Sequence, residues 1–384
     1  MALSEGHRRK YVVLGCGGYI GSHLLDSLLP DPSIQVVGFD PDVRKISQHL
    51  GRSNLKLYQQ YLNDAGGMDA FAAELDGADA VINLAAICNP SQYNTQPLAT
   101  IRSNCFDVYP VIEACAARKV WLVHFSTSEV YGRTLASYLP GDGDPYADPG
   151  LYELDEDGTP LIMGPIRNQR WTYACAKQLM ERFIYAHHKE SGLPFNIVRP
   201  LNFFGPRMDF IPGRDGEGVP RVLACFLTAL LDGRPMELVD GGTARRTIVS
   251  IHDAIRALRL ILERPERARN QIFNIGNRTT EVTIAELARL MRRIYAEVSG
   301  EPSYNEHPIV SVSSAAFYGE GYEDCDRRMP KVDKARELLG WEARVSLEDT
   351  LRETIEYYYT LFGPKKSARD PTVAPSGYVE PPAA

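Results

Sequence analysis

Short apolar runs alternate along the chain with longer stretches in which apolar residues recur every three or four positions. The short runs predict β-strands and the longer ones predict α-helices. Strands are predicted at 11–14, 34–39, 55–59, 80–86, 120–126, 195–199 and 271–275, and helices at 68–75, 101–118, 171–190, 221–231, 284–298, 331–339 and 347–361. One further strand and helix fall within 246–263. This alternation is typical of an α/β protein with a doubly wound parallel sheet and helices on both faces.

Prolines and glycines interrupt the pattern beyond Pro200, where we expect a second, smaller α/β domain to begin. The predicted division is a nucleotide-binding domain from 1–200 plus about 246–275, a substrate domain from about 201–245 plus 276–361, and a flexible tail at 363–384. The tail is rich in proline and charge, which predicts disorder. Residues 133–168 have little periodicity and are long for a connector, so we expect a loop over the site.

A glycine-rich turn follows the first strand, with Gly15, Gly18 and Gly21 three residues apart. Gly15 permits a sharp turn, Gly18 lets the backbone approach a pyrophosphate, and Gly21 allows the helix to pack close to the strand. The second strand ends in Asp40, nineteen residues after Gly21. A carboxylate there would accept hydrogen bonds from the adenosine ribose and repel a 2′-phosphate. The sequence therefore predicts a Rossmann domain that binds NAD rather than NADP.

Composition narrows the class of protein. The chain has 384 residues and a net charge of −7 with both signs interspersed, so we expect no general attraction to nucleic acid or membranes. The charged N-terminus MALSEGHRRK and the absence of an eighteen-residue apolar run favour a cytoplasmic location. Seven cysteines without CxxC spacing favour neither a metal site nor a disulfide framework. The pair His187 and His188 is interpreted as a solvated helix end.

Two motifs carry candidate chemistry: STSEVYG at 126–132, directly after a strand, and WTYACAKQ at 171–178. Tyr173 and Lys177 are four residues apart and share one helix face. A tyrosine with a pKa of about 10 is a poor base, but a nearby ammonium and an oxidised nicotinamide both favour its phenolate. Tyr173 would then take a proton from a hydroxyl while a hydride leaves the same carbon. By itself this spacing is common on ordinary helix surfaces.

Taken with the glycine turn, these motifs resemble the extended short-chain dehydrogenase/reductase superfamily, the nucleotide-sugar epimerases, dehydratases and decarboxylases. The resemblance runs from about residue 10 to 361. Within the superfamily the chain is most similar to NAD-dependent UDP-glucuronate decarboxylases and UDP-apiose/UDP-xylose synthases. Five segments are most similar to the second of these branches, the plant UDP-apiose/UDP-xylose synthases: INLAAICNPSQYNTQPL, RWTYACAKQLMERF, RPLNFFGPRMDFIPG, GVPRVLACF and FYGEGYEDCDRR.

The resemblance implies a role for each matching residue. Thr127 and Tyr173 would contact the sugar 4-hydroxyl, and Lys177 would tune the tyrosine and hold the nicotinamide ribose. Glu129 and Arg328 would handle decarboxylation, and the other catalytic candidates are Ser128 and Cys88. The cofactor would contact Gly15, Gly18, Tyr19, Ile20, Gly21, Asp40, Leu62, Tyr173 and Lys177. The UDP-sugar would contact Cys88, Tyr93, Arg170, Asn202, Arg221, Arg246 and Tyr322, where arginines suit a diphosphate and a carboxylate.

Three positions depart from the relatives. Tyr61 and Leu62 stand where relatives often place an aspartate that meets adenine, and Glu237 stands where one branch has a lysine. Ser128 replaces a cysteine of the apiose-forming branch, although Cys88, the second cysteine of that branch, is kept. The last departure disfavours UDP-apiose formation.

The implied reaction is oxidation of UDP-glucuronate at C4 and loss of C6 as carbon dioxide, giving UDP-4-keto-pentose and UDP-xylose. A UDP-apiose/UDP-xylose synthase is the alternative within this class. A nucleotide-sugar 4-epimerase and a non-catalytic dinucleotide sensor are alternatives of other classes. A 4,6-dehydratase is disfavoured because Ser128 cannot supply the acid it needs. We expect a homodimer that pairs through the helices at 101–118 and 171–190.

Overall fold

A seven-stranded parallel sheet forms the centre of the computed structural model, which describes residues 8–138, 144, 146–318, 325 and 327–364. Its strand order is β12-β7-β5-β4-β1-β2-β3. The strands are β1 (Arg9–Leu14), β2 (Ile34–Phe39), β3 (Leu55–Tyr58), β4 (Ala80–Asn83), β5 (Trp121–Phe125), β7 (Phe195–Pro200) and β12 (Gln271–Ile275). This order, with its reversal between β1 and β4, confirms the predicted doubly wound sheet.

Helices cover both faces of the large sheet because its strands are apolar on both sides. On one face lie α1 (Tyr19–Leu28), α8 (Ile251–Glu263), α9 (Pro265–Ala268) and α12 (Asp333–Leu339). The other face is covered by α2 (Gly67–Glu74), α5 (Tyr109–Arg118) and α6 (Thr172–Ser191). Two short helices, α3 (Pro90–Thr95) and α4 (Pro97–Ile101), precede α5. Across the described residues, no helix is long and apolar enough to cross a bilayer.

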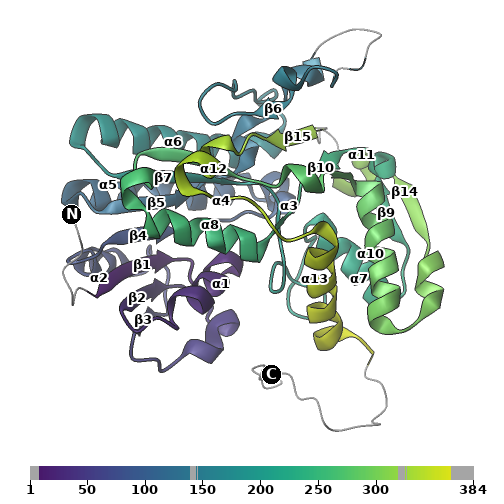
Figure 1. Cartoon of the computed structure of the whole chain (residues 1–384), viewed down its shortest axis with the longest axis horizontal. Helices are drawn as coiled ribbons and strands as arrows, with labels where there is room; N and C mark the ends of the chain where they lie inside the picture. Colours follow the sequence, from purple (N-terminus) through teal and green to yellow (C-terminus); the bar gives the residue numbers. More distant parts are fainter. Residues whose placement is uncertain (1–7, 139–143, 145, 319–324, 326, 365–384) are drawn as a thin grey trace.

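A smaller helical layer lies beside the large sheet and its helices (Figure 1). It contains α7 (Val222–Asp232), α10 (Ile284–Ser299) and α13 (Leu347–Phe362), which share a core of their own, with the short α11 (Ser314–Tyr318) nearby. Three small sheets lie within this layer or between it and the rest of the chain. They are β13-β10-β15-β6 (Val282–Thr283, Arg245–Arg246, Arg327–Pro330, Glu153–Leu154), β11-β8 (Val249–Ser250, Phe203–Phe204) and β14-β9 (Ile309–Val312, Met236–Val239).

Several elements differ from their predicted extents. The helix predicted at 101–118 is interrupted: α4 ends at Ile101, a π-helical turn follows, and α5 begins at Tyr109. Pro110 explains the restart, since proline is tolerated in the first turn of a helix but not in its interior. The predicted loop at 133–168 contains a short strand, β6, that pairs with β15. Helix α12, which the sequence assigned to the smaller domain, packs against α8, α9 and β12.

Candidate active site

The candidate site lies at the carboxyl ends of the parallel strands, where the strand order reverses between β1 and β4. The glycine turn follows β1 there. Gly15 has a φ of +79°, and a Cβ on it would lie 2.9 Å from the backbone nitrogen of Ala85. A Cβ on Gly21 would overlap the carbonyl oxygen of Gly15. The turn therefore requires glycine at both positions, and it leaves a bare backbone at the N-terminus of α1, which suits a pyrophosphate.

Asp40 closes the side of this turn. Its Oδ2 accepts a hydrogen bond from the Gly17 N–H at 2.9 Å, and its Oδ1 accepts one from the Asp42 N–H at 2.9 Å. Burial raises the pKa of Asp40, whereas these two amide hydrogen bonds lower it. A Cβ on Gly17 would overlap the carbonyl oxygen of Asp42, so Gly17 belongs to the site although the spaced glycine motif did not single it out. The sequence feature that could have indicated Gly17 is its position directly before Gly18, a glycine of the motif. This bare turn with a carboxylate at the end of β2 fits NAD.

The other cofactor candidates lie around the turn. Ile20 packs against the core shared with α8, and the Tyr19 ring lies edge-on to His23 with the ring centroids 5.6 Å apart. Leu62 packs against the core on the α2 and α5 face, whereas 60% of the Tyr61 side chain is exposed. Tyr61 therefore presents an aromatic side chain to solvent where relatives often place an aspartate.

Tyr173 and Lys177 are buried together on α6. The Thr127 hydroxyl is close enough to the Tyr173 phenol to lower its pKa by hydrogen bonding, and the Tyr173 ring stacks on Tyr93 with centroids 4.8 Å apart. The Lys177 ammonium donates to the carbonyl oxygen of Phe125 at 3.0 Å. The structure therefore brings the proposed base, its lysine and Thr127 into one cluster at the end of β5.

Burial sets the protonation of this cluster. It raises the pKa of Tyr173 well above its ordinary value, and the nearby Cys88 and Glu129 charges add to that rise. The Thr127 hydrogen bond acts in the opposite direction. Burial also lowers the pKa of Lys177 to about 8. Tyr173 therefore needs the positive charge of a bound oxidised nicotinamide before it can act as a base near neutral pH.

Glu129 lies two residues after Thr127 and is held by arginines. The Arg170 Nη1 lies 2.5 Å from Glu129 Oε2, and the Arg170 Nη2 lies 3.0 Å from Oε1. The Arg328 Nη1 lies 3.8 Å from the same Oε1. Arg328 is itself buried on β15, where it is aligned with Arg246 on the neighbouring parallel strand β10. The guanidinium of Arg170 thus engages Glu129, and the contact of Arg170 with the UDP-sugar that the resemblance implies stays a prediction.

The remaining substrate candidates have protein partners. The Arg221 side chain donates to Asp209 Oδ2 at 3.2 Å and to the carbonyl oxygen of Met208 at 2.7 Å. Asn202, at a φ of 49°, donates to the carbonyl oxygen of Thr247 at 2.8 Å. The Arg246 Nη1 donates to the carbonyl oxygen of Arg245 at 2.8 Å.

The thiol and hydroxyl candidates differ in their surroundings. Cys88 is exposed, and it lies close enough to Tyr173 for a charge on its sulfur to raise the tyrosine's pKa. Ser128, by contrast, is buried. Tyr322, the last substrate candidate, lies outside the described residues.

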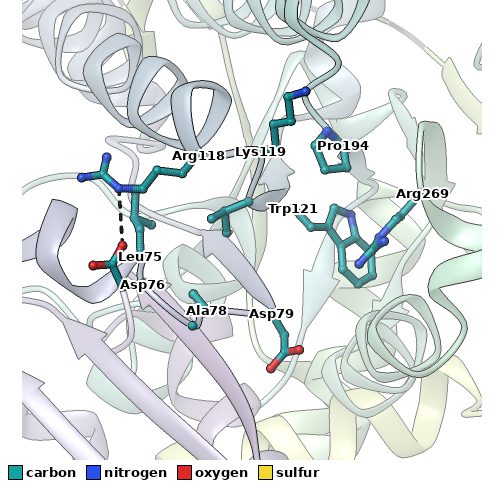
Figure 2. A pocket seen from close by; sticks show the side chains of 11 residues that line it. Leu75, Asp76, Ala78, Asp79, Arg118, Lys119, Trp121, Pro194 and Arg269 are labelled. Carbon is teal, nitrogen blue, oxygen red and sulfur yellow. Dashed lines mark ion pairs between the residues drawn. The ribbon is translucent and has the colours of Figure 1, made fainter. Parts of the chain in front are cut away.

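A surface cavity of about 520 Å³ lies at the opposite edge of the sheet, where β4, β5 and β7 begin. Figure 2 shows that its charged side chains do not converge on one point. Arg118 is directed to Asp76, with 3.7 Å between its Nε and Oδ1, and the Arg269 guanidinium lies 4.8 Å from the centre of the Trp121 ring. Because ligands of such sheets bind at the carboxyl ends of the strands, we do not assign this cavity to the active site.

The fold and the cluster around Tyr173 define a class: a dinucleotide-dependent enzyme with a buried tyrosine and lysine pair at the carboxyl end of the parallel sheet. Comparison with known proteins gives the family. The profile of the NAD dependent epimerase/dehydratase family matches residues 11–276, and the chain belongs to this family. The predicted family, fold and cofactor are thereby confirmed, and the cofactor is NAD.

The similarity to known proteins covers nearly the whole chain. UDP-D-apiose/UDP-D-xylose synthase 1 of Arabidopsis thaliana is 48% identical over 370 residues, which cover 94% of this chain and 95% of that protein. The UDP-D-apiose/UDP-D-xylose synthase of Oryza sativa subsp. japonica is 47% identical over 359 residues, covering 91% and 89%. Among solved structures, the PbgP3 protein of Burkholderia pseudomallei is 29% identical with a TM-score of 0.78, covering 92% and 96%.

Proposed function

We propose that the protein is an NAD-dependent UDP-glucuronate decarboxylase, which oxidises C4 of the sugar and releases C6 as carbon dioxide. The observation that carries this proposal is the position of Glu129. Glu129, whose carboxylate is held by Arg170 and lies close to Arg328, comes two residues after Thr127, a neighbour of the proposed base Tyr173. A cluster of charged groups therefore lies next to the oxidation site, where the uronate carboxylate would be. The names of the Arabidopsis and rice relatives support a UDP-pentose product.

The residues of the chain would act in sequence. Tyr173, oriented by Thr127 and by its stacking on Tyr93, removes the proton of the 4-hydroxyl. NAD, when bound, would take a hydride from C4 and could return it to the C4 ketone. Oxidation at C4 makes the C6 carboxylate part of a β-keto acid. The C5–C6 bond then breaks, its electron pair forms an enolate between C5 and C4, and carbon dioxide leaves. Arg328, or a water that it positions, delivers a proton to C5.

The fate of the ketone decides the product. If C4 is reduced before the ketone escapes, UDP-xylose forms, and if the ketone leaves first, UDP-4-keto-pentose and NADH are released. A second candidate, the UDP-apiose/UDP-xylose synthase activity named in the relatives, also needs proton exchange at hydroxyls far from C5. Cys88 offers an accessible thiol for that task, but Ser128 offers a buried hydroxyl. We therefore propose UDP-4-keto-pentose and UDP-xylose as the main products, with UDP-apiose minor or absent.

The decisive experiment is incubation of the purified protein with UDP-glucuronate and NAD⁺. Carbon dioxide release, NADH absorbance and NMR spectra of the sugar products would be followed together, with heat-treated protein as the control. We expect carbon dioxide and UDP-pentoses. Formation of UDP-galacturonate without carbon dioxide would establish a 4-epimerase instead, because epimerisation needs only oxidation and re-reduction at C4. Tight NAD binding with no conversion would favour a dinucleotide sensor.

A homodimer remains part of the proposal. Exposed apolar side chains lie on the two segments that we expect to pair, 101–118 and 171–190, or just before them: Phe106 in the π-helical turn is 65% exposed, Leu179 on α6 44%, and Leu98, shortly before residue 101, 77%. Such a surface is costly to leave in water and is typical of an interface. Light scattering coupled to gel filtration would test this, with Leu98→Asp combined with Phe106→Asp expected to give monomers. Monomeric wild-type protein would contradict the proposal.

A further inference from the structure

A buried arginine behind the candidate site links several elements. Arg199, near the end of β7, is only 3% exposed. Its Nε and Nη2 donate to the two carboxylate oxygens of Glu181 at 3.1 and 2.6 Å. Its Nη1 donates to the hydroxyl of Tyr131 at 2.8 Å and to the carbonyl oxygen of Glu156 at 3.2 Å. Four of the five guanidinium N–H groups are thus used within the protein, so Arg199 is not available to a ligand.

The chain of hydrogen bonds continues from Tyr131. Its hydroxyl donates to Asn274 Oδ1 at 2.8 Å. The Asn274 amide nitrogen donates to the carbonyl oxygens of Leu154 and Lys331 at 2.9 and 3.2 Å. The backbone N–H of Asn274 donates to Glu156 at 2.9 Å. Tyr131 and Asn274 are 1% and 0% exposed, so these bonds form in a region of low dielectric, where they are strong and costly to break.

Each end of this series of hydrogen bonds lies close to a proposed catalytic group. Glu181 is one helical turn beyond Lys177 on the same face of α6, and its charge helps to keep that lysine protonated. Tyr131 is two residues beyond Glu129 in the same 3-10 turn. Lys331 directly follows β15, the strand of Arg328. The hydrogen bonds therefore connect the three elements on which Tyr173, Glu129 and Arg328 are placed.

We propose that Tyr131, Arg199 and Asn274, here called the Arg199 frame, are positioning residues that set the Glu129 and Arg328 pair relative to Tyr173 and Lys177. This inference rests on the proposed decarboxylase function. The frame would keep the decarboxylated ketone aligned until C4 is reduced. A variant that breaks these hydrogen bonds would let more ketone dissociate before C4 is reduced. Each ketone that dissociates corresponds to one NADH that is not reoxidised. The frame therefore acts on the ratio of NADH to UDP-xylose, and not only on the overall rate.

Tyr131→Phe is the sharpest test because it removes one oxygen atom, the one that links Arg199 to Asn274, and keeps the ring. The matched control is Tyr295→Phe, which removes the hydroxyl of another buried tyrosine on α10, packed against Tyr304 in the smaller core. We expect Tyr131→Phe to raise the ratio of released NADH to UDP-xylose by about five-fold, the scale of one lost hydrogen bond. Tyr295→Phe should leave that ratio unchanged. An unchanged ratio in Tyr131→Phe would overturn the proposal.

A second measurement separates this inference from the proposed function, because it needs no turnover. Hydrogen exchange followed by mass spectrometry would compare peptides that cover 129–132, 154–156 and 329–331 in the NAD-bound wild-type and variant proteins. Tyr131→Phe should speed exchange in all three peptides, and Tyr295→Phe in none of them. Faster exchange without any activity on UDP-glucuronate would reject the decarboxylase proposal and keep the frame. Exchange equal to that of the wild type would reject the frame, whatever the substrate.

Discussion

Arg170 and Glu129, separated by 41 residues in the sequence, meet in a two-point ion pair with N–O distances of 2.5 and 3.0 Å. Arg170 is 3% exposed and Glu129 is shielded as well, so neither charge is well hydrated. Removing one member of such a pair leaves the other charge buried and uncompensated. Arg170 therefore orients the carboxylate of Glu129, and the Arg328 Nη1 lies 3.8 Å from the same carboxylate.

Replacing Arg328 by alanine should suppress carbon dioxide release much more than it weakens UDP binding, because its proposed task is at C5 and C6. Arg327→Ala is a suitable control, since Arg327 is the adjacent residue but pairs with Glu281 at 2.7 and 2.8 Å. Carbon dioxide release and UDP affinity by calorimetry would be measured for both variants. Undiminished decarboxylation in Arg328→Ala would contradict the assignment.

Tyr173→Phe should abolish oxidation at C4 and leave UDP binding nearly intact. The phenylalanine keeps the stacking on Tyr93 but cannot take the proton, and loss of a general base costs about 10²–10⁴ in rate. Single-turnover NADH formation and calorimetry with UDP would check the two halves of this prediction. Turnover at the wild-type rate would eliminate Tyr173 as the base.

Asp40 should make the enzyme prefer NAD⁺ over NADP⁺. Its carboxylate faces the glycine turn and would repel a 2′-phosphate, so the wild-type kcat/KM should be far higher with NAD⁺. Asp40→Ser should narrow the difference by weakening NAD⁺ binding and removing the repulsion. Equal efficiency of the wild-type enzyme with both cofactors would show that Asp40 does not contact the ribose.

The activity should fall as the pH rises through about 8. Burial lowers the pKa of Lys177 to about 8, so the ammonium that supports the Tyr173 phenolate is present below this pH and is lost above it. The expected observation is a decline of kcat/KM for UDP-glucuronate on the alkaline side of a pH series, because kcat/KM reports the groups of the free enzyme. Lys177→Arg, whose guanidinium stays charged in this range, should be slower overall but lack the decline. A pH profile shared by both enzymes would exclude Lys177 as its origin.

Ser128→Cys should increase the fraction of UDP-apiose, which we expect to be minor in the wild type. A thiol with a pKa near 8.5 exchanges protons around neutrality, whereas a serine hydroxyl needs separate activation. Product NMR of the variant, compared with Ser128→Ala as a control for the loss of the hydroxyl, would measure the change. UDP-apiose as the main product of the wild-type enzyme would overturn this interpretation of Ser128.

The sequence predicted the fold well because the large sheet depends on local patterns. Apolar runs define its buried strands, and Gly15 and Gly21 stand where the turn leaves no room for a Cβ. The interruption before α5 was missed because the apolar period continues through it, and only Pro110 indicated a restart. The motifs and the family resemblance also predicted that Thr127, Tyr173 and Lys177 belong to one site.

Contacts between distant segments could not be read from the sequence. The ion pair of Arg170 with Glu129 and the hydrogen bond of Gly17 to Asp40 depend on where separate elements meet in space. Nothing in the local pattern distinguishes Arg170 from an arginine that contacts substrate, since guanidinium groups suit both tasks. The Arg199 frame is a further case, because Tyr131 lies in a turn and Asn274 in a strand, and neither position indicates its partner.

The pairing of β6 and β10 with β15 has a consequence for how the chain is made. Strands from the regions of residues 153, 245 and 327 must meet before Arg328 lies beside β10, so the last of these contacts waits for a late part of the polypeptide. Contacts between segments so far apart form slowly, and an emerging chain folds its N-terminal part first. A nascent protein would thus acquire the glycine turn and Tyr173 well before Arg328. During biosynthesis the protein would thus form its dinucleotide-binding turn before it could carry out the proposed decarboxylation.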